Sequence, residues 1–131
     1  AIDWLAVTQP AHVQNTSYIA MANARVEKDP KGALTLLAEV REVLVDDEQS
    51  FTEAVVRLVN HADSWIWSNF DQIPLNMHYA ASAALAERAL KGKLSFEKYR
   101  LWLRNSPSRQ ALDGGEETIR NYQETEPSNV P

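Results

Sequence analysis

The chain has 131 residues, of which 44% are hydrophobic and 24% charged, a composition typical of a globular domain that can bury a core. It contains no cysteine, which excludes disulfides, thiolate catalysis and cysteine-based metal sites. No apolar run approaches the roughly 20 residues that a membrane helix needs, and the opening AIDWLAVTQP lacks the features of a secretory signal. We therefore expect a cytoplasmic protein that uses no cofactor or metal and does not enter a membrane.

The net charge of −5 conceals three segments of different sign. Residues 1–87 carry twelve acidic and five basic residues, a net charge of −7. Residues 88–109 carry seven basic residues and one acidic residue (+6), and residues 110–131 carry five acidic residues and one basic residue (−4). One short basic segment therefore lies between two acidic ones.

Apolar residues recur with helical spacing along the chain, and no window shows the sustained alternation that predicts a strand. The first helix is predicted over about 10–28. Asp29 then offers an N-cap, and Pro30 a first-turn residue, for a second helix over about 30–45 whose apolar stripe ends at Leu44. Such stripes predict the buried faces of the two helices.

A third helix is predicted to begin at the motif SFTE, because Ser50 and Glu53 form the two halves of a capping box. It continues to about Phe70 and ends there, since Pro74 disfavours a helical conformation of Ile73. The residues that we expect in the core are Leu37, Val40, Leu44, Val55, Val59, Ala84 and Leu85.

Two further helices are predicted in the second half of the chain. The fourth, over about 74–91, contains six alanines, which let neighbouring backbones approach on more than one side and favour a central position. Gly92 closes this helix in a left-handed conformation. Ser95 begins a fifth helix that ends near Asn105.

The predicted fold is a single all-α domain over residues 1–105, a bundle or orthogonal array of about five helices, with a polar acidic tail over 106–131. The prolines and the Gly114–Gly115 pair of the tail are typical of a disordered segment, within which we expect one short helix at 116–124. Because the tail is tethered, even weak ion pairing keeps it near basic residues. The expected contacts of the tail, in the same chain or in another copy, are Lys98, Arg100 or Arg104.

Known catalytic and metal-binding patterns are missing from the sequence, which has no glycine-rich phosphate loop, nucleophile elbow, HExxH or paired ExxH motif. His61 and Asp63 lie two residues apart and point in different directions on a helix, so they form no local dyad. His78 follows Met77, a pair more typical of packing than of metal ligation. We expect a non-catalytic protein; an enzyme with a site around His61 or His78 is the third hypothesis.

Trp65 and Trp67 flank Ile66 in the stretch SWIWSNF, so their side chains diverge on a helix. If Ile66 faces the core, at least one indole lies near the surface. A half-exposed Trp needs no function, whereas an exposed Trp beside Phe70 is typical of a hot spot for another protein. Trp65, Trp67 and Phe70 are therefore candidate partner-binding residues.

The stretch KGKLSFEKYRLWLRNSPSR, residues 91–109, combines six basic residues with three aromatic ones. At helical spacing Phe96, Tyr99 and Leu103 share one face, with Trp102 alongside. This predicts that the aromatic side chains are buried and do not serve as stacking platforms for bases. The basic residues that remain on an exposed ridge are Lys93, Lys98, Arg100 and Arg104, and the last three complete the candidate site.

The basic ridge matches an acidic protein surface better than a nucleic acid, because its acidic flanks repel phosphates and the chain has a pI of about 5.1. We therefore expect a protein-binding helical domain, such as a small accessory, inhibitor, immunity-like or assembly subunit. Its expected partner is another protein with an acidic surface or a second copy of the chain. The second hypothesis is a nucleic-acid-associated regulatory protein that uses residues 88–109.

Overall fold

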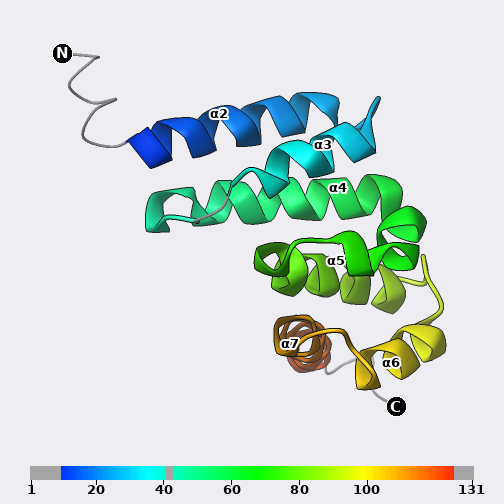
Figure 1. Cartoon of the computed structure of the whole chain (residues 1–131). Helices are drawn as coiled ribbons and strands as arrows, with labels where there is room; N and C mark the ends of the chain where they lie inside the picture. The colour runs from blue at the N-terminus through cyan, green and yellow to red at the C-terminus, as the bar shows by residue number, and fades with distance from the viewer. Residues whose placement is uncertain (1–9, 41–42, 126–131) are drawn as a thin grey trace. The chain divides into compact units, whose positions relative to one another are not determined.

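The computed structural model describes residues 10–40 and 43–125, and within these ranges every regular element is helical (Figure 1). Six α-helices, α2 to α7, follow one another in this part of the chain, with short 3₁₀ turns between some of them. The all-α prediction is confirmed. The chain divides into two compact units, Ala1–Ala62 (unit 1) and Asp63–Pro131 (unit 2), so the boundary expected after residue 105 lies inside unit 2.

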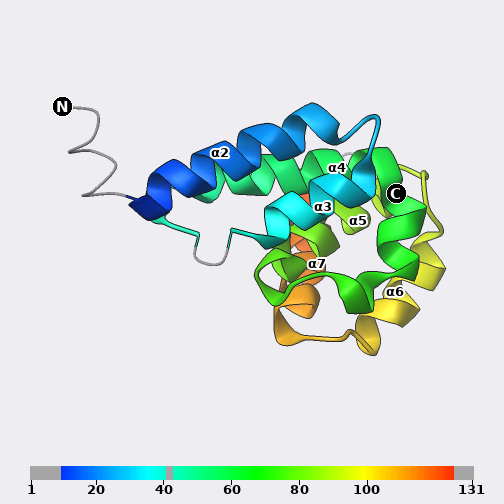
Figure 2. The same cartoon turned by 45° about the horizontal axis from the view of Figure 1, so that its top comes forward.

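Unit 1 begins with the pair α2 (Pro10–Arg25) and α3 (Pro30–Ala38), which contact one another across a tight turn (Figure 2). The turn has the predicted chemistry. Asp29 Oδ1 accepts the Gly32 N–H at 3.0 Å, and the proline that follows Asp29 is the first residue of α3. A side-chain cap and a proline with a preset φ therefore begin this helix.

The second helix is shorter than predicted, because α3 ends at Ala38 and not near residue 45. The following residues include Val40 and Val43, whose β-branched side chains disfavour a helix. Leu44 lies beyond the helix and is half-buried, so its predicted place in the core is wrong. The other six residues predicted in the core are buried: Leu37, Val40, Val55, Val59, Ala84 and Leu85.

The third helix, α4 (Glu48–Ser68), begins two residues before Ser50, so the predicted capping box does not start it. Its N-terminus follows a 3₁₀ turn that contains Asp46 and Asp47, whose negative charges favour the positive end of the helix dipole. The Asp47 carboxylate is buried and accepts a hydrogen bond of 3.0 Å from Asn15 Nδ2. This bond joins the turn before α4 to α2.

The backbone of α4 departs from helical geometry at Ala62, with φ −135° and ψ 44°. The division between the two units falls directly after this residue. Residues 48–62 of the helix therefore belong to unit 1, and residues 63–68 belong to unit 2.

In unit 2 the helix α5 (His78–Leu90) contacts both α6 (Phe96–Arg104) and α7 (Arg109–Thr125). This agrees with the central position predicted from its alanines, since most residues of α5 are buried. Two 3₁₀ turns precede α5, and the extended backbone of Ile73 before Pro74 is the predicted break.

Both ends of the α5–α6 connection have the predicted geometry. Gly92 adopts φ 80°, a left-handed conformation that glycine reaches without steric cost. The Lys93 N–H bonds to Arg88 O at 2.8 Å and the Gly92 N–H to Ala89 O at 3.1 Å, the two bonds of a Schellman motif. Ser95 Oγ then accepts the N–H of the third residue of α6 and caps this helix.

The segment predicted as a polar tail instead forms α7, a helix of 17 residues that packs against α5. Figure 1 shows α7 nearly end-on beside α5, so the two helices cross. A Cβ atom added at Gly114 would lie 2.3 Å from the Tyr79 carbonyl oxygen, and one added at Gly115 would lie 2.3 Å from Tyr99 Oη. The two glycines therefore permit the close approach of α7.

Each helix within residues 10–40 and 43–125 is too short or too polar to cross a lipid bilayer.

Candidate functional site

An aromatic cluster joins α6 to the last turn of α4 inside unit 2. Tyr99 is completely buried, and its hydroxyl donates a hydrogen bond of 2.9 Å to Ser82 O on α5. The Trp102 ring lies edge-on to Phe70, with 4.9 Å between the ring centroids, and also contacts Trp67. The face of α6 that was predicted to be buried is therefore packed against unit 2, with Trp102 half-buried.

This cluster changes the interpretation of the three aromatic site residues. Phe70 is only 3% exposed, so the prediction that it lies on an open partner-binding surface is wrong. Trp67 is half-buried and packs against Tyr99, with 6.2 Å between the ring centroids. Trp65 is also half-buried. The rings that pack against Phe70 are those of Trp102 on α6 and His78 on α5, both of which reach it through tertiary packing.

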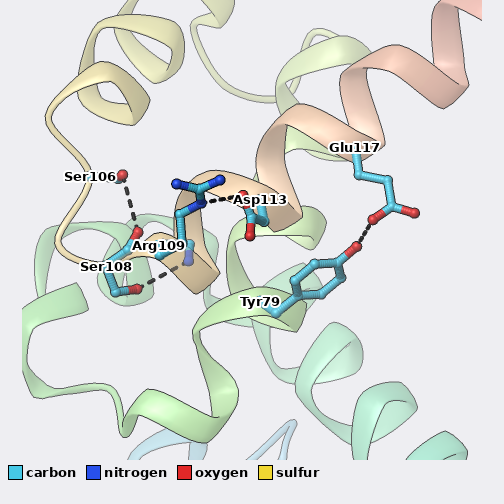
Figure 3. A network of polar contacts seen from close by, with 7 residues as sticks. Tyr79, Ser106, Ser108, Arg109, Asp113 and Glu117 are labelled. Atoms are coloured by element: carbon cyan, nitrogen blue, oxygen red, sulfur yellow. Dashed lines mark hydrogen bonds and ion pairs between the residues drawn. The ribbon is translucent and has the colours of Figure 1, made fainter.

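Three cations of the segment 88–109 are paired with carboxylates in unit 2. The pairs are Arg88–Asp63, Lys91–Glu87 and Arg109–Asp113, and the last is drawn in Figure 3. Lys98, Arg100 and Arg104 are exposed on α6, as predicted. The basic segment therefore presents its free charge mainly along this one helix.

A groove of about 290 Å³, which we call the arginine groove, lies between α6 and α7. Arg100 and Arg104 line one side, and Arg120 belongs to the other side; Lys98 lies outside the groove. The remaining lining residues are Leu103, Leu112, Glu116, Ile119 and Gln123. Because the three apolar residues are buried or half-buried and the polar ones exposed, the groove has an apolar floor and a charged rim.

The rim carries three guanidinium groups and one carboxylate, a net charge of +2. No ion pair joins Arg100, Arg104 or Arg120 to another residue in the described part of the chain, although Arg100 lies over the Phe96 ring at 5.8 Å. A guanidinium offers a planar fork of donors that matches a carboxylate. The arrangement can therefore hold an anionic group next to one or two apolar side chains.

The N-terminus of α7 contains a serine–histidine contact that the sequence did not predict. Ser108 Oγ lies 2.7 Å from His78 Nδ1, and His78 Nε2 donates to Ile73 O at 2.8 Å. A serine beside a histidine has the geometry of a nucleophile and its base. Here, however, Ser108 Oγ also accepts the Ala111 N–H at 3.1 Å and so caps α7. Neither residue lines the arginine groove, and we interpret the contact as a structural link.

A second link between α5 and α7 joins Tyr79 to Glu117 (Figure 3). The Tyr79 hydroxyl donates to the carboxylate, and this hydrogen bond raises the pKa of Tyr79 to about 12. His61, the other histidine of the enzyme hypothesis, is exposed, with its Nε2 atom 3.0 Å from Glu27 O. No group of three or more His, Asp or Glu side chains is placed to hold a metal ion within the described ranges.

Unit 1 has a groove of opposite charge, about 280 Å³ in volume, where the start of α4 meets α2. Three carboxylates line it, those of Asp46, Asp47 and Glu53. The other lining residues are Thr16, Ile19, Ala20, Asn23 and Ser50. The Oδ1 atom of Asn23 is buried and accepts no hydrogen bond from any residue that the structure describes.

The arginine groove thus contains two of the six predicted site residues, Arg100 and Arg104. Its α7 side was not predicted, although Leu112, Glu116 and Ile119 have the spacing of one helix face. Compared with protein-family models, with curated proteins and with solved structures, the chain has no match.

Proposed function

We propose that the chain is a non-catalytic protein-binding domain that uses the arginine groove to bind an acidic segment of a partner protein. The observation that carries the proposal is a rim of three arginines, none paired with a carboxylate among the described residues, around an apolar floor. Acidic side chains of the partner pair with the rim, and an apolar side chain between them fills the floor. Domains that bind in this way serve as accessory, inhibitory or assembly subunits.

The volume of the groove supports a peptide segment as its ligand. About 290 Å³ is at the lower limit of the pockets that enclose a small molecule, and it accommodates one or two large side chains. Few polar groups line the floor to orient a substrate. Anchoring by one apolar side chain with charged neighbours is typical of peptide recognition on helical surfaces.

Two observations favour a protein over a nucleic acid. Three of the seven cations in residues 88–109 are already paired with carboxylates, which reduces the charge available to phosphates. Tyr99 is buried and Trp102 half-buried within the aromatic cluster, so neither presents an open face on which bases stack.

The test is a fluorescence-anisotropy titration with a labelled peptide that contains the sequence Glu-Leu-Glu, at low salt. Reversing one rim charge in Arg104→Glu turns an attraction into a repulsion, and we expect binding to weaken about tenfold, which corresponds to about 1.4 kcal/mol. Lys93→Glu makes the same charge change in unit 2 outside the groove and should alter binding by less than about twofold.

Two control peptides separate the contributions of charge and floor. Replacing both glutamates by glutamine should abolish the salt dependence, and replacing the leucine by serine should weaken binding at every salt concentration. If Arg104→Glu and Lys93→Glu bind the Glu-Leu-Glu peptide equally well, the groove is not the binding site. Tighter binding of a single-stranded oligonucleotide that depends on Arg104 would favour the nucleic-acid hypothesis instead.

A further inference from the structure

Two surfaces of opposite charge lie in different units of the chain, the arginine groove in unit 2 and the start of α4 in unit 1. Within unit 2 the carboxylates of Asp63, Glu87 and Asp113 are paired with basic residues, and that of Glu117 accepts a hydrogen bond from Tyr79. The exposed carboxylates of Asp46, Glu48 and Glu53 in unit 1 form no ion pair with another residue that the structure describes. The start of α4 therefore exposes three carboxylates that are not held in an ion pair with a described residue.

The start of α4 has the charge of the ligand that the arginine groove is proposed to bind. Residues 46–53 contain four acidic residues and no basic one, a net charge of −4. Asp47 is buried, so three of the four carboxylates are exposed, with Ser50 and Thr52 exposed between them. Phe51, the one apolar residue of the segment, is buried. The rim of the arginine groove carries +2, from three arginines and one glutamate. Opposite charges on two surfaces favour their association and fix its orientation.

We propose that the chain associates with itself head to tail: residues 46–53 of one copy, the acidic turn, bind in the arginine groove of a second copy. This inference rests on the proposed function and names the partner as a second copy of the chain. The two surfaces belong to different units, so each copy carries one acidic turn and one arginine groove. Because the two surfaces of the contact differ, repeated head-to-tail contacts can build closed rings or open chains.

The expected association is weak and sensitive to salt. Exposed ion pairs contribute little individually, and two copies that each carry −5 repel one another outside the contact. The association therefore requires low ionic strength, because screening shortens the range of the charge–charge attraction.

Two charge-reversal variants test the proposal in the full chain. The groove variant carries Arg100→Glu and Arg104→Glu, and the turn variant carries Asp46→Lys and Glu53→Lys. Sedimentation velocity should show that the average mass of the unmodified chain rises with concentration at low salt and returns to that of a monomer at high salt. Each variant alone should remain monomeric.

The equimolar mixture of the two variants is the decisive sample. The turn variant retains its groove and the groove variant retains its acidic turn, so one productive contact remains. The mixture should therefore form a complex that stops at one copy of each variant. The matched controls, Lys93→Glu and Glu27→Lys, change exposed charges outside both surfaces and should associate like the unmodified chain. Circular dichroism of each variant establishes that it is folded.

Several results overturn the inference. They are an unmodified chain that stays monomeric at every concentration in low salt, mixed variants that form no complex, and controls that lose association as strongly as the two variants. If the Glu-Leu-Glu peptide still binds in the groove while the chain stays monomeric, the self-association is wrong and the proposed function stands. If the peptide binds the groove variant as well as the unmodified chain, the proposed function itself fails.

Discussion

Replacing Gly114 by alanine tests whether close backbone approach holds α7 against α5. In an exposed helix interior this change stabilises by about 1 kcal/mol, because alanine has the higher helix propensity. At Gly114 the added Cβ would lie 2.3 Å from the carbonyl oxygen of Tyr79, a backbone atom that no rotamer change can move. To relieve the contact α7 must move away from α5, so we expect the substitution to destabilise unit 2.

The magnitude follows from two opposing terms. Overpacking costs about 1–3 kcal/mol, and the upper half of this range applies where a backbone atom blocks the new group. After the propensity gain of about 1 kcal/mol is subtracted, the free energy of unfolding should fall by about 1–2 kcal/mol. Urea denaturation followed by tryptophan fluorescence measures this loss, because Trp65, Trp67 and Trp102 all belong to unit 2.

A neighbouring substitution provides the matched comparison. At Gly115 the added Cβ would meet side chains, Tyr99 Oη at 2.3 Å and Leu103 Cδ1 at 2.8 Å. Tyr99→Phe removes the first contact, so it should recover part of the loss caused by Gly115→Ala and none of the loss caused by Gly114→Ala. Gln110→Ala on the exposed side of α7 should stay within about 0.5 kcal/mol. A Gly114→Ala variant as stable as the unmodified chain would refute the packing of α7 on α5.

Three further predictions concern the core, the α5 cap and the response to alkali. Leu37→Ala should cost about 2–5 kcal/mol in urea denaturation followed by circular dichroism, because Leu37 is completely buried; a loss near zero would contradict its place in the core. Gly92→Ala should cost about 1–2 kcal/mol in the same assay, since its φ of 80° strains any residue with a Cβ, and an unchanged stability would contradict that conformation. Burial raises the pKa of Tyr99 from 10.0 to about 12, so the folded state retains the proton longer than the unfolded state. Stability should therefore be constant with respect to this group below pH 10 and fall between pH 10 and about 12, by at most about 3 kcal/mol. Urea midpoints across this pH range should show a shallower fall in Tyr99→Phe, and equal slopes would rule out Tyr99 as the source.

Local chemistry predicted several helix ends correctly. Asp29 and Ser95 begin α3 and α6 as side-chain caps, and Gly92 ends α5 through a left-handed backbone. A few neighbouring residues are enough to produce each of these features. Where no such signal exists, the prediction was less accurate. The end of α3 depends on the modest propensities of β-branched residues, and Ser50 lies inside α4 although its motif matches a capping box.

Tertiary contacts account for the remaining differences. Gly114 and Gly115 suggested a flexible tail because glycine lowers helix propensity, yet their lack of side chains is what allows α7 to approach α5. The burial of Phe70 likewise depends on Trp102, which lies on a helix far along the chain. Sequence periodicity identifies the inward face of a helix, but it does not identify which helix covers that face.

The arginine groove depends on the same contacts, because no single helix contains it. Packing of Tyr99 and Leu103 turns one face of α6 inward, and this leaves Arg100 and Arg104 on the exposed side. Helix α7 contributes the third arginine, Arg120, and two of the three apolar floor residues, Leu112 and Ile119. The glycines of α7 permit the packing that brings these residues to the groove. A ligand that binds across both helices stabilises the folded arrangement of unit 2 by mass action. The proposed binding of acidic segments and the packing of α7 are therefore thermodynamically linked: a substitution that displaces α7 should weaken both.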